Sequence, residues 1–200
     1  MQTASLAALA LLAALPATAD MRDADRDRMH ALDAHLGATL RAGLADGTPK
    51  ALTALTDTMA GQHDATLLAG LSGDWTCRTI KIGGPAPLIV YGTFRCRIRD
   101  LEPGAWRIEK LTGSQRLVGQ IALQATLANG PSPAIYTGVG YVDGGPARSY
   151  GAFPAQQTPI EPGQTVPQVG LLEMPDANRA RILMPAPLLE SRFDILSLTR

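Results

Sequence analysis

The amino-acid sequence predicts a mainly β protein: an antiparallel up-and-down barrel, preceded by an N-terminal helical segment. Three observations support this prediction. From Trp75 onward, apolar and polar residues alternate. Glycines and prolines interrupt that pattern at short intervals. In the segment before Trp75, leucines recur every fourth residue. We divide the chain into a signal peptide (1–19), a helical segment (20–70) and a barrel domain (71–200).

The N-terminus has the pattern of a cleavable signal peptide. An apolar run from Ala4 to Leu15 is too short to span a bilayer. It is followed by Ala17-Thr18-Ala19, whose small residues at positions −3 and −1 suit signal peptidase. Met1-Gln2-Thr3 supplies no basic side chain, which departs from the usual pattern, and a buried N-terminal helix is the alternative. We expect cleavage after Ala19, a periplasmic or secreted chain, and no stable membrane anchor after cleavage.

The segment after the leader predicts two helices. Leucines at every fourth position, extended by Met29 and Met21, give the first helix an apolar stripe: Leu32, Leu36, Leu40 and Leu44. Asp46-Gly47 ends this helix. Thr48 then offers an N-cap and Pro49 a first-turn proline for a shorter second helix with Leu52, Leu55 and Met59 on one face.

About eight short strands follow, separated by turn-forming residues, and this spacing favours a sandwich or an up-and-down barrel. The expected strands are Trp75–Ile82, Leu88–Asp100, Trp106–Leu111, Gln115–Gln124, Ile135–Val142, Val169–Met174, Arg179–Met184 and Arg192–Leu198. Between the fifth and sixth lies a long segment rich in proline and glycine, residues 143–170. A loop of this length is usually functional or disordered, so we interpret it as either a site-edge lid or a surface excursion.

Cys77 and Cys96 are the only cysteines, and an isolated pair in an oxidising compartment predicts a disulfide. Folding the chain as a hairpin just after Gly83-Gly84-Pro85 places the two residues opposite each other. Closing this loop should stabilise the fold by about 3 kcal/mol in the chain-entropy model. Metal ligation is the competing interpretation, but it needs further ligands that the neighbourhood lacks. We therefore expect a disulfide and no metal site.

Charge and motifs narrow the function classes. The formal net charge is zero, from 18 basic and 18 acidic residues, which argues against nucleic acid or an anionic membrane as a partner. His30, His35 and His63 fall in the helical segment, without the spacing of a metal site, and no serine lies in a nucleophile elbow. We expect no catalytic residue and no cofactor. A pair of carboxylates remains open among Asp74, Glu102, Glu109, Glu173 and Glu190.

The most suggestive chemical feature is an arginine stripe on the second strand. Arg95, Arg97 and Arg99 alternate with apolar residues, so their side chains share one face, where Arg78 of the first strand joins them near Arg95. Aligned guanidinium groups can bind a phosphate or carboxylate; the alternative is a solvated outer face. With Tyr150 in the long loop, these three arginines are the candidate ligand-binding residues.

Gly73-Asp74-Trp75, at the start of the first strand, resembles the Gly-x-Trp signature of lipocalins. The resemblance implies a calycin-like barrel in which Trp75 closes one end and an arginine from the last strand, matched by Arg192, packs across it. The chain departs from the family in lacking its later Thr-Asp-Tyr motif, so lipocalin ligand specificity does not follow.

A broader resemblance covers Leu71 to Leu198. The segments 71–78, 113–117 and 188–194 are similar to an uncharacterised family of exported bacterial proteins, a domain of unknown function. This resemblance implies a periplasmic setting and no assigned activity.

Two function hypotheses from different classes follow. The first is non-enzymatic binding of a small apolar or amphipathic ligand inside the barrel, since barrels of about eight strands can enclose one small molecule. The second is a cell-envelope interaction or inhibitor protein that meets a protein partner through the arginine stripe or the 143–170 loop. A hydrolase is third.

Overall fold

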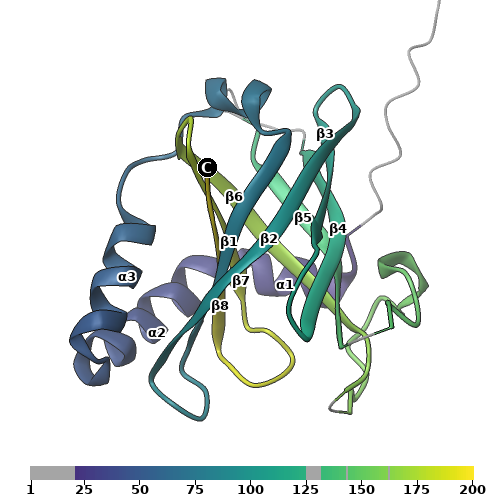
Figure 1. Ribbon diagram of the computed structural model, residues 1–200. Coiled ribbons are helices and arrows are strands. Elements are labelled where there is room, and N and C mark those ends of the chain that lie inside the picture. The colour runs from purple at the N-terminus through teal and green to yellow at the C-terminus, as the bar shows by residue number, and fades with distance from the viewer. Residues whose placement is uncertain (1–20, 125–131, 143, 162) are drawn as a thin grey trace, which may run out of the picture.

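The computed structural model describes residues 21–124, 132–142, 144–161 and 163–200. It shows a closed barrel with three helices and a short 3-10 helix along the chain before the first strand (Figure 1). The expected signal peptide and its cleavage site lie outside the described residues. Among the residues that are described, no helix combines the length and the apolar character needed to cross a membrane.

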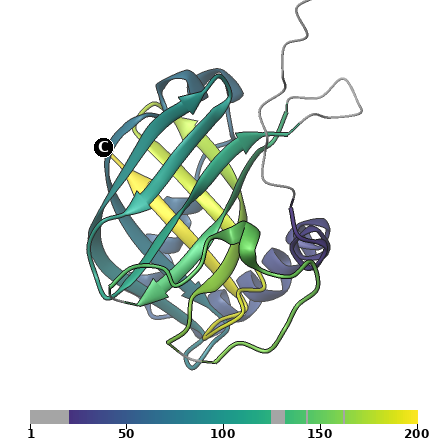
Figure 2. The same cartoon turned by 90° about the vertical axis from the view of Figure 1, so that its right-hand side faces the viewer.

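Each of the eight strands pairs antiparallel with the next, and the last pairs with the first, which confirms the predicted up-and-down barrel (Figure 2). The strands are β1 (Gly73–Ile82), β2 (Leu88–Glu102), β3 (Ala105–Lys110), β4 (Gln115–Leu123), β5 (Ala134–Val142), β6 (Val166–Asp176), β7 (Arg179–Pro185) and β8 (Phe193–Thr199). The loop between β5 and β6 is shorter than the predicted 143–170, because Val166 to Gly170 pair with β5. It contains the short 3-10 helix η2 (Tyr150–Ala152).

The helices are α1 (Asp23–His30), α2 (Leu32–Asp46), α3 (Pro49–Met59) and the 3-10 helix η1 (Ala65–Gly70). The expected first helix is interrupted at Ala31, and Leu44 is exposed instead of continuing the apolar stripe. The second helix begins as predicted: the Thr48 side chain accepts a hydrogen bond from the Ala51 N–H, and Pro49 is its first residue.

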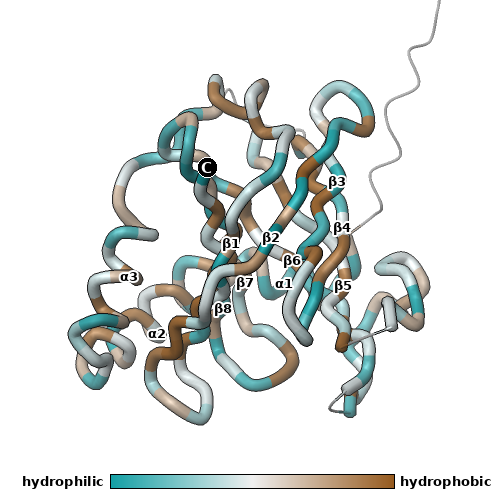
Figure 3. Tube along the Cα trace, viewed as in Figure 1, coloured by the Kyte–Doolittle hydropathy of each residue, from teal (hydrophilic) through white to brown (hydrophobic). Residues whose placement is uncertain are grey.

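The helices cover the outer face of one side of the barrel. Ile80 of β1, Leu183 of β7 and Ile195 of β8 point outward and pack with Leu32 of α2 and Leu55 of α3. Where the helices cover them, these three strands are therefore apolar on the outer face, whereas polar residues occupy many of the connecting loops (Figure 3). Burial on both sides explains why the alternating pattern is weak in the last two strands.

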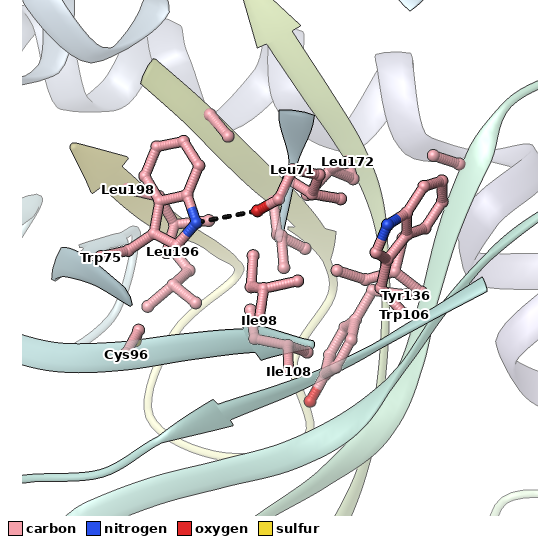
Figure 4. Packing of buried hydrophobic residues seen from close by; sticks show 14 of the residues in the cluster. Leu71, Trp75, Cys96, Ile98, Trp106, Ile108, Tyr136, Leu172, Leu196 and Leu198 are labelled. Atoms are coloured by element: carbon pink, nitrogen blue, oxygen red, sulfur yellow. Dashed lines mark hydrogen bonds between the residues drawn. The ribbon is translucent and has the colours of Figure 1, made fainter. Parts of the chain in front are cut away.

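The barrel interior is a packed apolar core at one end. Trp75 and Ile98 meet Leu71, which η1 places over this end of the barrel, and the Trp75 Nε1–H donates to the Leu71 carbonyl at 3.0 Å (Figure 4). The larger side chains of this core are Trp75, Ile98, Trp106, Ile108, Ile121, Tyr136, Leu172, Met174, Ile182, Leu196 and Leu198.

The arginine that packs on Trp75 is Arg200, so the expectation of Arg192 is wrong. The Arg200 guanidinium lies 4.0 Å from the centre of the Trp75 ring and donates to the carbonyls of Gly70 at 2.7 Å and Ser72 at 2.7 Å. The strand register is the reason: Thr76 pairs with Thr199, so the residue after β8 meets Trp75. Arg192 precedes β8 and lies exposed at the other end of the barrel.

The predicted disulfide between Cys77 and Cys96 is confirmed, with a Cα–Cα distance of 5.8 Å. The two residues lie diagonally across β1 and β2, not directly opposite: Cys77 pairs with Phe94, and Cys96 with Trp75. A register shift between Arg78 and Ile80 accounts for part of the difference, and Ile82 pairs with Leu88 around the turn. Arg95 consequently lies opposite Thr76, and Arg78 opposite Thr93.

Candidate ligand-binding cavity

A cavity of about 300 Å³ occupies the end of the barrel opposite η1. Four strand connections meet there: β1–β2, β3–β4, β5–β6 and β7–β8. The cavity lining includes Lys81, Lys110, Gln115, Leu117, Gln168, Met184, Leu188, Leu189, Glu190 and Asp194. A volume of this size lies at the lower end of the range for small-molecule sites.

Strand alternation carries the polar residues into the barrel. Side chains two apart in a strand point to the same face. In β3 the inward series runs from Ile108 to Lys110, and in β8 it runs from Asp194 to Leu196. In these two strands the inward positions are thus apolar in the core and polar at the cavity.

Lys81 and Glu190 form an ion pair at the cavity wall. The Lys81 ammonium also donates to Gln115 Oε1 at 3.1 Å, and the Gln115 amide donates to both Glu190 carboxylate oxygens at 3.1 Å. These hydrogen bonds hold the pKa of the Glu190 carboxyl below its ordinary value, and the hydrogen bond from Lys81 has the largest effect. The cluster ties the β7–β8 loop to β1 and β4.

Lys110 is the second buried lysine of the cavity. Its ammonium donates to the Gln115 carbonyl at 2.8 Å and lies 3.8 Å from the centre of the Phe94 ring. Burial, and secondarily repulsion from Lys81, lowers the pKa of Lys110 to about 8. Among the described residues, no carboxylate lies within ion-pair distance of Lys110.

Asp194 faces Lys81 across the β1–β8 pairing. Its side chain is buried, and it accepts a hydrogen bond of 2.6 Å from the Ser191 hydroxyl. Burial raises the pKa of Asp194 to about 6, because the desolvation penalty exceeds the effects of Ser191 and Lys81.

Tyr136 separates the cavity from the apolar core. Its ring belongs to the core, while its hydroxyl donates to Oε1 of Gln168, a cavity-lining residue, at 3.1 Å. Glycines make room for this ring: a Cβ at Gly138 would lie 2.5 Å from the Tyr136 hydroxyl, and one at Gly119 2.5 Å from the ring. Glycine inside a strand often marks such a close approach.

The candidate ligand-binding residues from the sequence lie elsewhere. Arg95, Arg97 and Arg99 share the outer face of β2, as the alternation predicts, and Arg97 forms a 2.5 Å ion pair with Asp74. Arg99 lies directly opposite Arg107 of β3. A ligand-binding role for this stripe stays a prediction.

Tyr150 does not line the cavity. It is buried in the β5–β6 loop, where its hydroxyl donates to Asp25 of α1 at 2.6 Å. Arg22 pairs with the same carboxylate at 3.4 Å and donates to the Pro154 carbonyl at 2.7 Å. The loop is thereby attached to α1 (Figure 2), and the residues of its described part that line the cavity are Gly163 and Gln164.

The residues with catalytic potential are scattered. His63 Nδ1 accepts a hydrogen bond from the Met174 N–H at 3.0 Å, away from the cavity. Five acidic residues were candidates for a catalytic pair of carboxylates, and of these five Glu190 lies in the described cavity lining. Within the described ranges, no three histidine, cysteine or acidic side chains gather as a metal site.

Lys81, Lys110 and Asp194 were not predicted from the sequence as cavity residues. A signal for the lysines was present: the chain has three lysines, and two of them continue the inward-facing series of predicted strands. A lysine on the apolar face of a strand is unusual, because its charge is rarely buried without a partner.

Fold and cavity together define a small closed-barrel protein with one end packed and the other hollow and charged. Residues 18–198 match the family described as a domain of unknown function (DUF4893), so the chain belongs to this family. The match confirms the resemblance to an uncharacterised family, while its exported character stays an expectation. No curated protein shows a significant match to the chain.

Proposed function

We propose that this protein binds a small amphipathic molecule, without chemical conversion, in the cavity at the loop end of the barrel. The observation that supports this most is the composition of the lining. Leu117, Met184 and Leu189 offer apolar contact, while Lys81 and Lys110 offer charged donors within the same cavity. Ligand sites commonly combine an apolar wall with a few placed polar groups.

Binding is better supported than hydrolysis. The described lining includes neither histidine, serine nor cysteine, so the Ser–His and Cys–His pairs of many hydrolases are missing from it. Its Glu190 carboxylate is already engaged by Lys81 and Gln115 and has a lowered pKa, which disfavours a role as general acid.

Native mass spectrometry of the gently purified protein tests this proposal. We expect a co-purifying small molecule, and we expect Val142→Trp to reduce its occupancy, because Val142 lines the cavity and is 44% exposed. Leu123→Trp is the matched control: Leu123 is 37% exposed and is not part of the lining. An empty wild-type protein, with no thermal shift across a lipid panel, would contradict the proposal.

We also propose export to the periplasm or the cell exterior. The buried Cys77–Cys96 disulfide supports this location, because such bonds persist in oxidising compartments. Intact-mass measurement of the protein from its native cells provides the test. A mass that corresponds to the chain from Asp20 with both sulfurs oxidised is the expected result, and an uncleaved leader or free thiols would contradict it.

A further inference from the structure

We propose that the ligand carries a carboxylate, and that this group pairs with Lys110 of the cavity lining. This inference rests on the proposed binding function and specifies its ligand class. It is carried by the charge balance of the lining, the contacts of Lys110 and the apolar surface beside it.

Among the described residues, the lining has more positive than negative side chains. Its cations are Lys81, Lys110 and Arg116, and its carboxylates are Glu190 and Asp194. The Arg116 Nε donates to the Gly113 carbonyl at 3.1 Å. One positive charge is thus in excess even with both carboxylates ionised, and a monoanionic ligand would balance it.

The contacts of the two lysines show which of them lacks a negatively charged partner. Lys81 is already paired with Glu190. Lys110 has a carbonyl acceptor from Gln115 and the face of the Phe94 ring, but no anion among the described residues. An ammonium has three N–H donors, and a buried charge without a counter-ion is costly. A ligand carboxylate would supply both an acceptor and the counter-ion.

The neighbouring surface defines the rest of the molecule. Leu117, Met184, Leu188 and Leu189 line the same cavity, so an aliphatic chain attached to the carboxylate would contact apolar side chains. The volume of about 300 Å³ favours a short chain. The class that fits is a monocarboxylic acid with a small aliphatic body.

Three probes of equal chain length test the head group: octanoate, 1-octanol and octylamine, each titrated calorimetrically into the full mature chain at pH 7. We expect octanoate to bind most tightly and octylamine least. Lys110→Met keeps the aliphatic stem and removes the charge. It should weaken octanoate binding about 10- to 100-fold, the range for a lost charge-assisted hydrogen bond, and change 1-octanol binding by less than about threefold.

Two further variants test whether the effect depends on a positive charge at position 110. Lys110→Arg keeps a cation at the site and should retain a preference for octanoate over 1-octanol. Lys50→Met, on the exposed surface of α3, removes the one lysine outside the cavity and should leave all three affinities unchanged.

The outcomes separate this inference from the proposed function. Equal binding of octanoate and 1-octanol, unaffected by Lys110→Met, would overturn the carboxylate assignment and leave cavity binding standing. A co-purifying molecule without an acidic group would overturn the carboxylate assignment in the same way. No binding of any probe, together with an empty purified protein, would overturn both.

Discussion

Arg200 joins three parts of the molecule through one side chain. Its guanidinium packs on the Trp75 ring and donates to the carbonyls of Gly70, the last residue of η1, and Ser72, just after it. The Gly70 carbonyl is at the end of a helix, where backbone acceptors otherwise lack partners. Arg200 therefore fixes η1 over the apolar end of the barrel.

Arg200→Ala should lower the free energy of unfolding by about 1–3 kcal/mol, since it removes a cation–π contact and charge-assisted hydrogen bonds. Arg192→Ala is the matched control, because Arg192 is exposed at the opposite end, and its effect should stay within about 0.5 kcal/mol. Urea denaturation of both variants measures the difference. Equal effects would show that Trp75 does not depend on Arg200.

Asp194 provides a second test at the level of one residue. Its pKa is raised to about 6 in the folded protein from an ordinary 3.8, so the folded state binds more protons than the unfolded state between these values. Stability should therefore fall as the pH rises through this window, by up to about 3 kcal/mol from this group. Asp194→Asn should remove that component.

Urea unfolding at pH 4 and pH 7 checks the Asp194 prediction. The substitution Asp194→Asn should change the free energy of unfolding in the stabilising direction by more at pH 7 than at pH 4, each measured against wild type at the same pH. Asp74→Asn is the control with the opposite sign: Arg97 lowers the pKa of Asp74, so its contribution is lost as the pH falls. Parallel pH profiles for wild type and Asp194→Asn would contradict the assignment.

At the scale of elements, polar contacts fix the helices on the barrel in addition to the apolar cluster. Arg181 of β7 donates to the carbonyls of Thr58 at 3.0 Å and Gly61 at 3.1 Å, and so closes the C-terminal end of α3. Asp25 of α1 is fully buried and pairs with Arg22 and Arg28. Both helices are thereby held at one end by buried arginines.

Tyr150→Phe should loosen α1 and the β5–β6 loop together. The change removes the hydroxyl that donates to Asp25 and accepts the Arg22 N–H at 3.3 Å, and should cost about 1–3 kcal/mol. Hydrogen exchange is expected to rise in residues 22–30 and 147–157, with octanoate affinity unchanged. Tyr91→Phe, at an exposed side chain without a hydroxyl partner among the described residues, should leave exchange unaltered. A loss of affinity without faster exchange would instead assign Tyr150 to the ligand.

At the scale of the whole molecule, the cavity couples ligand binding to pH. The other charged groups in the described part of the cavity lining are Lys81, Arg116, Glu190 and Asp194. The pKa of Lys110 is about 8, so the ammonium that pairs with a carboxylate is lost above this pH. Octanoate affinity should fall by up to about tenfold per pH unit above about 8. Titrations at pH 7, 8, 9 and 10 measure this, and Lys110→Met should show no such fall.

The sequence predicted the barrel because strand alternation and turn residues are local signals, and it predicted the disulfide because two cysteines leave one pairing. It did not predict Arg200, since the partner of Trp75 depends on the β1–β8 register, which joins the first strand to the last. The alternation indicates that Lys81 and Lys110 face inward, but not that a cavity lies beside them. Which end of the closed barrel is packed and which is hollow depends on η1 and the loops, and no local pattern reports it.

Closure of the barrel also limits how the protein can meet another chain. Among the described strands, β1 to β8 form a continuous ring, so each has hydrogen-bonded neighbours on both sides. Exposed strand edges are where a second polypeptide adds by backbone pairing, in specific complexes as in aggregation. An envelope partner would therefore have to recognise side chains on the outer wall, such as Arg95, Arg97 and Arg99, and the folded protein should resist fibril growth by strand addition.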